Sequence, residues 1–384
     1  MKKGWETKNL GDLCDILDHK RKPITKRDRI AGDYPYYGAT GILDHVAGYL
    51  FDEPLVLLGE DGAKWESGEN TAFPVSGKIW VNNHAHVLRP HRMELLDNWL
   101  IHYLNHSDLN EFVSGLTVPK LNQGNMREIP IPLPPLPEQK RIVGILDEAF
   151  AGIATAKANA EKNLQNARAL FESHLNDVFT KRGKGWVEKR LDDVCVIGDG
   201  NHSSNYPKKE ELVAAGVPFI RATNLVGGQI SDDDMRYLSP EKHAQLKKGH
   251  LKTGDVLFTN RGEIGKTAIV DRAHDGSNLN SQIAWFRCRN ELCNRFLFYV
   301  LNSGKMKMHI NLSQNGAALQ QFTIRQIKEL QIPVPPQTEQ LTVVKKIDQL
   351  SKEVDHLEFI YQHKLDELDA LKKSLLHQAF TGAL

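Results

Sequence analysis

The sequence consists of two related halves, and this duplication limits the possible folds more than any other feature. GWETKNLGDLCDI, which begins at Gly4, matches GWVEKRLDDVCVI, which begins at Gly185, at an offset of 181 residues. The offset grows along the chain and reaches 201 where Gly115–Gln139 matches Gly316–Gln340. Chance similarity would scatter the offsets, whereas these only increase, so an internal repeat is indicated. The second copy holds about 17 extra residues, between Thr223 and Asp255.

Each half ends in a segment that the sequence predicts to be one long helix. Glu138–Thr180 and Glu339–Thr381 are both 43 residues long and align without a gap. Apolar residues recur in each at steps of three and four, which is typical of a coiled-coil seam. The expected seam residues are Ile142, Leu146, Ala149, Ile153, Ala156, Ala160, Leu164 and Ala167 in the first helix, and Val343, Ile347, Leu350, Val354, Leu357, Tyr361, Leu365, Leu368, Leu371 and Leu375 in the second. Each helix would be about 64 Å long.

The segments before these helices read as mixed α/β (α+β) globular domains. Short apolar runs between Gly, Asp and Pro residues predict strands. They are Pro54–Leu58, Lys78–Val81, Val217–Ile220, Asp255–Phe258, Thr267–Val270 and Ile283–Cys288. Short helices are expected at Leu95–Leu104 and Arg295–Asn302. The predicted organisation is therefore a domain over 1–137, a helix over 138–181, a domain over 182–338 and a helix over 339–384.

The composition is that of an ordinary globular protein. Charged residues make up 25% and hydrophobic residues 40%, and the formal net charge is +1. This balance gives no global argument for nucleic acid, although a local basic patch is compatible with it. No apolar run is long enough for a membrane helix, and no signal peptide is recognisable. The four cysteines form no disulfide framework, so we expect a reducing cytoplasm.

Few motifs suggest chemistry. RGEIGKTAIV, from Arg261, resembles the end of a phosphate-binding loop, but Asn260 stands where that motif requires glycine. A glycine turn between two strands is therefore expected there. His84 and His86 could form a metal pair, but no Cys or carboxylate accompanies them at ligand spacing, so we predict a surface strand and no metal. Cys14 and Cys195 lie on apolar stretches and are expected in the core.

What remains is a set of polar side chains of the types that read DNA bases. Arg and Lys suit guanine, whereas Asn and Gln suit adenine. The candidates in the first half are Lys64, Asn82, Asn83, His84, Lys120, Asn122 and Gln123. Those in the second half are His202, Ser203, Asn205, Arg221, Asn224, Asn260, Arg261, Asn280, Gln282, Gln320 and Gln321. Any single one is a poor signal, because surface loops are rich in Asn and Gln.

PLPPLPEQKRIVGILDEAF, at Pro132–Phe150, precedes the first long helix, and IPVPPQTEQ repeats the junction before the second. With the GW start and GDVLFTNRGEIGKTAIV, these segments resemble the specificity subunit of type I restriction-modification systems over essentially the whole chain. The resemblance implies that each globular half reads one part of a split double-stranded DNA target. It also implies that the helices pair antiparallel as a spacer and dock two modification subunits, with Glu138, Gln139, Glu339 and Gln340 at the junctions. The second junction lacks one proline of the pattern.

The resemblance further implies a non-catalytic chain without its own cofactor. Its methyltransferase partners would use S-adenosylmethionine, and restriction subunits could join them. Two other classes stay open at this point. One is a protein scaffold with two binding domains on a coiled coil, and the other is an enzyme with an unrecognised site. Steep salt dependence of DNA binding would distinguish a DNA reader from a scaffold.

Overall fold

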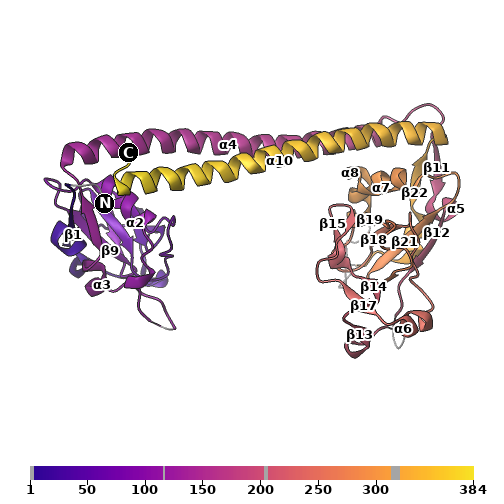
Figure 1. The fold of residues 1–384 in the computed structure, drawn as a ribbon, viewed down its shortest axis with the longest axis horizontal. Coiled ribbons are helices and arrows are strands. Elements are labelled where there is room, and N and C mark those ends of the chain that lie inside the picture. The colour runs from indigo at the N-terminus through magenta and orange to yellow at the C-terminus, as the bar shows by residue number, and fades with distance from the viewer. Residues whose placement is uncertain (1–3, 116, 203–205, 313–320) are drawn as a thin grey trace. The chain divides into compact units, whose positions relative to one another are not determined.

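The computed structural model describes residues 4–115, 117–202, 206–312 and 321–384, and its fold is mixed α/β (Figure 1). The chain divides into two compact units. Unit 1 comprises Met1–Lys162 and Tyr361–Leu384, and unit 2 comprises Asn163–Ile360. Each unit thus contains a globular part, one end of the first long helix and the opposite end of the second. Among the candidate residues, Ser203, Asn205 and Gln320 lie outside the described residues.

Unit 1 is built on two four-stranded sheets and one two-stranded ladder. The first sheet has the order β2-β9-β6-β7 and is antiparallel, whereas the second, β4-β3-β8-β5, contains the parallel pair β3–β8. The ladder joins β1 to β10. The strands are β1 (Glu6–Asn9), β2 (Cys14–Ile16), β3 (Ala31–Gly38), β4 (Gly41–Val46), β5 (Phe51–Asp52), β6 (Leu55–Gly59), β7 (Ala72–Val75), β8 (Lys78–Val81), β9 (Ala85–Pro90) and β10 (Pro130–Leu133). The short helices are α1 (Leu10–Leu13), α2 (Asp97–His106) and α3 (Gln123–Arg127).

Unit 2 repeats the first sheet and the ladder, but its second sheet has its fourth strand at the opposite edge, on β17 and not on the parallel partner β20, and it adds a hairpin. Its sheets have the orders β12-β21-β18-β19 and β13-β17-β14-β20, with β14–β20 as the parallel pair, and β11 pairs with β22. The strands are β11 (Val187–Arg190), β12 (Cys195–Asp199), β13 (Leu212–Val213), β14 (Val217–Ile220), β15 (Leu225–Val226), β16 (Gln229–Ile230), β17 (Arg236–Leu238), β18 (Val256–Thr259), β19 (Thr267–Ile269), β20 (Asn278–Leu279), β21 (Ile283–Cys288) and β22 (Gln331–Val334). The short helices are α5 (Leu191–Val194), α6 (Pro240–Gln245), α7 (Asn294–Asn302), α8 (Gly304–Leu312) and α9 (Ile324–Glu329). The added hairpin β15–β16 belongs to the insertion that the sequence comparison found.

The central strands are apolar throughout because both of their faces are buried. In β6, Val56 and Leu58 contribute to the core cluster that contains α2, while Leu55 and Leu57 contribute to a separate cluster on the opposite face. Strand β18 does the same in unit 2, since its alternate side chains also enter two clusters. The two-residue period of a strand explains this division. A continuous apolar run therefore marks the middle of a layered unit.

The predicted strands and short helices are confirmed, with boundaries that shift by up to two residues. The first six residues of RGEIGKTAIV form the turn between the antiparallel strands β18 and β19, as expected, and the rest enters β19. Cys14 and Cys195 are buried in the core, 3% and 2% exposed, and burial raises the pKa of Cys14 to about 12. The chain that the structure describes contains no helix long and apolar enough to cross a membrane.

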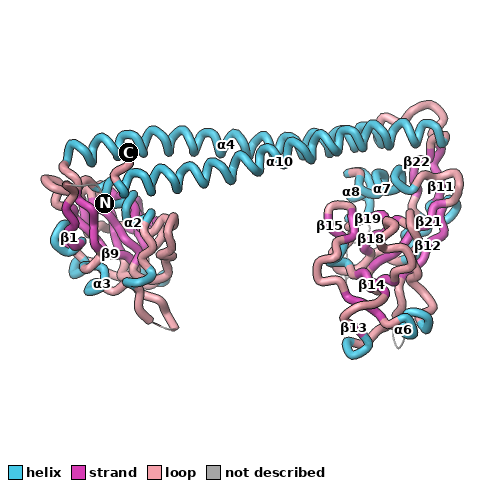
Figure 2. Tube along the Cα trace, in the orientation of Figure 1, coloured by secondary structure: helices cyan, strands magenta, loops and turns pink. Residues whose placement is uncertain are grey.

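The two long helices are α4 (Leu136–Thr180) and α10 (Gln337–Thr381), each of 45 residues (Figure 2). In unit 1 the start of α4 contacts the end of α10, where Lys157 Nζ lies 2.7 Å from Asp369 Oδ1. In unit 2 the end of α4 contacts the start of α10, where Arg168 Nη2 lies 3.0 Å from Glu358 Oε2. The predicted antiparallel pairing is thus confirmed within each unit.

The apolar seam of the helices agrees with the prediction over most positions. Ile142, Leu146 and Ile347 are buried, and Ile153 and Val354 nearly so. The prediction is wrong at Leu371, which is 47% exposed. A period of 3.6 residues moves a strict three-and-four stripe slowly around the helix, so part of a long stripe turns away from its partner.

Candidate nucleic-acid interface

Two glutamines lock the starts of the long helices onto the globular units. The Gln139 side chain accepts a hydrogen bond from Leu96 N at 2.9 Å and donates to the carbonyls of Glu94 and Pro134 at 2.7 and 2.8 Å. Gln340 makes the equivalent three bonds in unit 2, with Cys293 N, Glu291 O and Pro335 O. Both side chains are completely buried.

Of the two roles expected at the junctions, docking and spacing, the burial of both glutamines favours spacing. Their amides are fully used inside their own units, so they fix the direction in which each helix leaves its domain. The neighbouring glutamates are more accessible. Glu138 pairs with Arg141 at 2.8 Å, and Glu339 accepts a hydrogen bond from Trp186 Nε1 at 2.6 Å.

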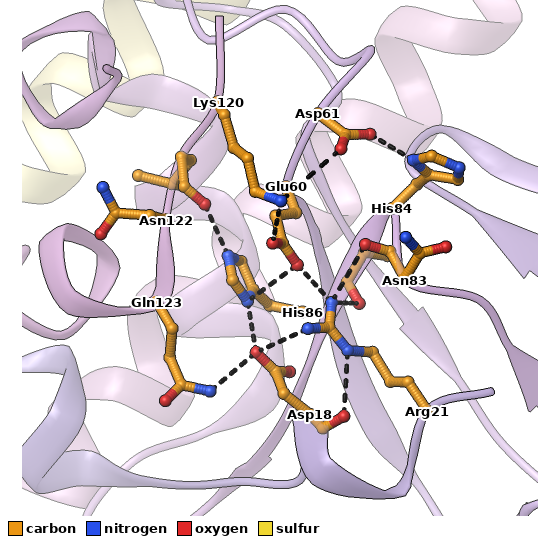
Figure 3. A network of polar contacts seen from close by, with 12 residues as sticks. Asp18, Arg21, Glu60, Asp61, Asn83, His84, His86, Lys120, Asn122 and Gln123 are labelled. Carbon is orange, nitrogen blue, oxygen red and sulfur yellow. Dashed lines mark hydrogen bonds and ion pairs between the residues drawn. The ribbon is translucent and has the colours of Figure 1, made fainter. Parts of the chain in front are cut away.

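A charged network occupies the end of the first sheet in unit 1 (Figure 3). His86, on β9, has Nδ1 2.6 Å from Asp18 Oδ2 and Nε2 2.7 Å from the Leu121 carbonyl. Arg21 contacts the carboxylates of Asp18, at 3.3 Å, and of Glu60. Lys120 contacts the other oxygen of Glu60 at 2.8 Å. The network joins segments from four parts of the unit.

The cations of the network keep its buried carboxylates ionised. Burial alone would raise the pKa of Glu60, but hydrogen bonds from Lys120 and Arg21 outweigh it and hold that pKa below its usual range. Burial likewise opposes the ionisation of Asp18, yet His86, Gln123 and the Val87 amide together lower its pKa. Two carboxylates surrounded by fixed donors form a rigid platform.

The structure corrects the interpretation of the two histidines. His84 lies in the turn before β9, half exposed, and its Nδ1 contacts Asp61, whereas His86 is fully buried. Carboxylates accompany His86 after all, because ligand atoms of Asp18, Glu60 and His86 lie within 4.8 Å of one another. These residue types can hold a metal ion, but Arg21 and Lys120 already supply positive charge to the same oxygens.

The network predicts acid sensitivity of unit 1. Because the folded-state pKa values of Asp18 and Glu60 are lowered, their stabilisation is present above the unfolded values of about 3.9 and 4.3 and is lost as pH falls through the folded values. We expect Asp18→Asn to lower the unfolding free energy at pH 7 by about 1–3 kcal/mol and to flatten its decline in acid. Urea unfolding between pH 3 and 7 measures this. Glu66→Gln, at an exposed carboxylate, is the control and should leave the decline unchanged.

A basic loop follows Asp18 directly, and the sequence analysis included none of its residues among the candidates. Between residues 19 and 29 the chain holds six Lys or Arg residues and one Asp. Trp80 Nε1 fixes this loop by donating to the Lys22 carbonyl at 2.6 Å, and the Tyr36 hydroxyl accepts from Ile24 N at 3.0 Å. No side-chain ion pair involves the exposed Lys20, Lys22 or Lys26 within the described ranges. The run of basic residues is visible in the sequence, but the near-zero net charge of the whole chain gives no hint of it.

Unit 2 places a polar cluster around a single arginine at the equivalent sheet end. Arg261 Nη1 lies 3.4 Å from His202 Nδ1, and His202 Nε2 lies 2.7 Å from Asp199. The Gln321 amide oxygen, in the orientation that satisfies both groups, accepts from Arg261 Nε and Nη2 at 3.2 and 3.1 Å. Asn280 Nδ2 donates to Gln282 Oε1 at 3.0 Å. The cluster is therefore built mainly from amides and one guanidinium.

The same backbone scaffold carries these two different sets of side chains. Glu60 N donates to His84 O in unit 1 as Asn260 N donates to Gln282 O in unit 2, both at 2.9 Å. An isolated β-bridge joins Asp61 to Lys120 in unit 1 and Arg261 to Gln321 in unit 2. The two repeats thus share one loop backbone geometry. The side chains on it differ: unit 1 presents charged pairs, whereas unit 2 presents amides and an arginine.

The other candidate residues divide by burial. Asn82, Asn224 and Asn260 are 3%, 1% and 2% exposed and bond to nearby backbone, so they shape loops and do not project outward. Asn83 is exposed and directly precedes His84. The remaining candidates lie outside both clusters or have structural partners.

Lys64 is exposed, 3.6 Å from Glu69, and Arg221 pairs with Asp234 at 2.9 Å. Asn122 caps helix α3 by accepting from Asn125 N at 2.9 Å. The structure therefore brings together Asn83, His84 and Lys120 in unit 1, and His202, Arg261, Gln282 and Gln321 in unit 2.

Two repeated α/β units, each containing antiparallel ends of the two long helices, define a tandem-repeat class of protein. The family described as type I restriction modification DNA specificity domain matches residues 2–165 and 183–362. The chain belongs to this family.

Known relatives and solved structures agree with this assignment. A Haemophilus influenzae protein named as a type I restriction enzyme specificity subunit is 27% identical over 89% of this chain and 86% of its own. The MjaVIII specificity subunit of Methanocaldococcus jannaschii is 23% identical over 99% of this chain and 93% of its own. A chain from a structural study of the assembly and conformational transition of the type I R-M system superposes with a TM-score of 0.79 at 20% identity, covering 100% of this chain and 99% of that one. The HsdS subunit from Thermoanaerobacter tengcongensis gives 0.58 at 20% identity, covering 100% and 98%. These two structures support the fold.

Proposed function

We propose that the chain is the DNA-target recognition subunit of a type I restriction-modification complex, in which each unit reads one half of a bipartite site. The observation that carries this is the repeated loop scaffold, which presents different polar side chains in the two units. Such a pair of surfaces suits two different short sequences. Family membership supports DNA as the ligand.

In this proposal the basic loop over 19–29 binds phosphates beside the first half-site. Phosphate contacts position a protein on DNA, and base contacts then provide specificity. Lys247 offers a similar charge in unit 2, because the buried Asn201 accepts from the backbone amides of Lys247 and Lys248 at 3.2 Å and so fixes their turn next to His202. The Lys248 ammonium is paired with Asp199 at 3.0 Å.

The long helices would set the distance between the half-sites. Each starts in one unit and ends in the other, and 45 residues of helix extend about 68 Å. The buried Gln139 and Gln340 would transmit this distance rigidly to the reading loops. Methyltransferase subunits, with S-adenosylmethionine, would supply the chemistry, and this chain would have no catalytic role.

Selection of bound duplexes from a random library, with the full-length chain alone and with modification subunits, tests the proposal. We expect two enriched sequence blocks separated by a constant gap, and binding that weakens steeply with salt. Absence of enrichment together with salt-independent behaviour would instead favour a protein scaffold.

Neutralising the loop should change affinity without changing sequence preference. In a variant with Lys20, Lys22 and Lys26 replaced by alanine, each lost phosphate contact should reduce the slope of log affinity against log salt by about 1. Titration at several salt concentrations measures the slope. Replacement of the exposed Lys345, Lys346 and Lys352 on α10 is the charge-matched control. An unchanged slope in the loop variant would remove the loop from the interface.

A further inference from the structure

Arg261 differs from most arginines of unit 2 because no carboxylate neutralises it. Arg287, Arg295 and Arg221 pair with acidic side chains at 2.7, 2.6 and 2.9 Å. Within the part of unit 2 that the structure describes, Arg261 contacts only the neutral Gln321 amide and His202. Its full positive charge therefore remains available to a ligand.

The partners of Arg261 also orient its guanidinium. Gln321 takes one N–H of Nε and one of Nη2, while the longer contact to His202 Nδ1 takes one N–H of Nη1. A guanidinium has five N–H groups in a planar fork, so two remain, one on each terminal nitrogen. Gln321 occupies the Nε/Nη2 edge, so the Nη1/Nη2 end of the fork is the edge that it leaves open.

The surroundings of Arg261 resemble a surface for base edges more than a phosphate pocket. Gln282, directly before β21, is exposed, and its Nε2 lies 3.7 Å from where a Cβ added at Gly262 would stand. Gly262 has φ +73°, a conformation that keeps this side of the loop open. Amides beside an arginine suit mixed donor and acceptor patterns, whereas the neighbouring exposed Lys247 suits phosphates.

We propose that Arg261 reads a guanine in the half-site bound by unit 2, with its two free N–H groups donating to the O6 and N7 atoms of the base. This inference rests on the proposed function and specifies one contact within it. Guanine is the base whose major-groove edge presents two adjacent acceptors. Gln321 is a positioning residue that holds the fork.

The equivalent position in unit 1 supports the assignment by contrast. Asp61 stands there, and its carboxylate contacts His84 and lies 3.8 Å from Lys120, the counterpart of Gln321. This position offers acceptors and a lysine point charge, with no planar fork. Only the half-site of unit 2 should therefore contain a guanine that depends on this scaffold position.

The test compares the full-length chain with Arg261→Gln, Arg261→Lys and Gln321→Ala by selection from random duplexes and by affinity titration. We expect Arg261→Gln to relax one guanine position and to lower affinity for the selected site by about 5- to 150-fold. Arg261→Lys should lose most of the preference although it keeps the charge. Gln321→Ala should weaken the same position and no other. Arg272→Gln is the matched control, because Arg272 is exposed and lies outside the cluster.

Base analogues provide a readout that a structural role of Arg261 would not change. In the selected site, 7-deazaguanine lacks the N7 acceptor and should weaken binding of the unmodified protein, whereas inosine retains O6 and N7 and should not. Arg261→Gln should bind the guanine and 7-deazaguanine duplexes equally. If this variant instead loses affinity equally for all sequences, Arg261 contacts phosphate and the inference is wrong. If the unmodified chain selects no sequence at all, the proposed function itself fails.

Discussion

Gln340→Ala is expected to lower the unfolding free energy of unit 2 by about 2–5 kcal/mol, because three backbone groups lose their hydrogen bonds to this side chain. Cys293 N, Glu291 O and Pro335 O each bond to this one amide, which is completely buried. An unsatisfied buried donor or acceptor costs about 1–3 kcal/mol, although water entering the cavity would recover part of it. Chemical denaturation and hydrogen exchange of the α7 region would measure the effect.

Two further variants separate hydrogen bonding from packing at this position. Gln340→Glu keeps the size of the side chain but places oxygen against two carbonyl oxygens, so it should be at least as destabilising as alanine. Gln349→Ala removes an exposed glutamine of the same helix and should change the unfolding free energy by less than about 0.5 kcal/mol. Equal, small effects of all three would show that Gln340 does not anchor the helix.

The sequence contained enough information for the architecture because it is encoded locally. Residues close together in the chain determine the features that predicted it. These are the equal lengths of the two helical segments, their three-and-four pattern and the apolar runs of β6 and β18. Periodicity reports which faces are buried, and that follows directly from helix and strand geometry.

The candidate site was less predictable because it is assembled by tertiary contacts. Asp18, Glu60 and His86 are separated by 42 and 26 residues, and only the pairing of β2, β6 and β9 brings them together. The glutamines at the helix starts matched between the two halves, but a match cannot distinguish a buried anchor from a docking contact. Residues that cap turns, such as Asn82, are of the same types as residues that read bases, so residue type alone cannot separate the two roles.

The equivalence of unit 1 and unit 2 extends to an aromatic residue near the end of each long helix. Phe380, on α10, is 7% exposed, and its ring centroid lies 4.9 Å from that of Trp99 and 5.1 Å from that of Tyr103. Phe179, on α4, is 2% exposed and lies 5.6 Å from Phe296. Each domain core is thus completed by the helix that follows the other domain in the sequence.

Phe380→Ala should therefore destabilise unit 1, whose Trp99 and Tyr103 lie more than 270 residues earlier in the chain, by about 3–5 kcal/mol. The loss combines the transfer free energy of the ring, the cavity it leaves and its edge contacts with two aromatic partners. Phe179→Ala should have a similar cost in unit 2.

Hydrogen exchange read separately for β6 and β18 measures both effects. Phe380→Ala should accelerate exchange in β6, and Phe179→Ala should accelerate it in β18. Leu371→Ala, at an exposed position of the same helix as Phe380, should change neither strand by more than about 0.5 kcal/mol. If Phe380→Ala leaves β6 protected, the C-terminal helix end is not part of the core of unit 1, and the helix pair could not hold that domain at a fixed distance. If hydrogen exchange in β6 accelerates as expected, the Phe380 contact that stabilises the domain also fixes the domain to the helix that would separate the two half-sites.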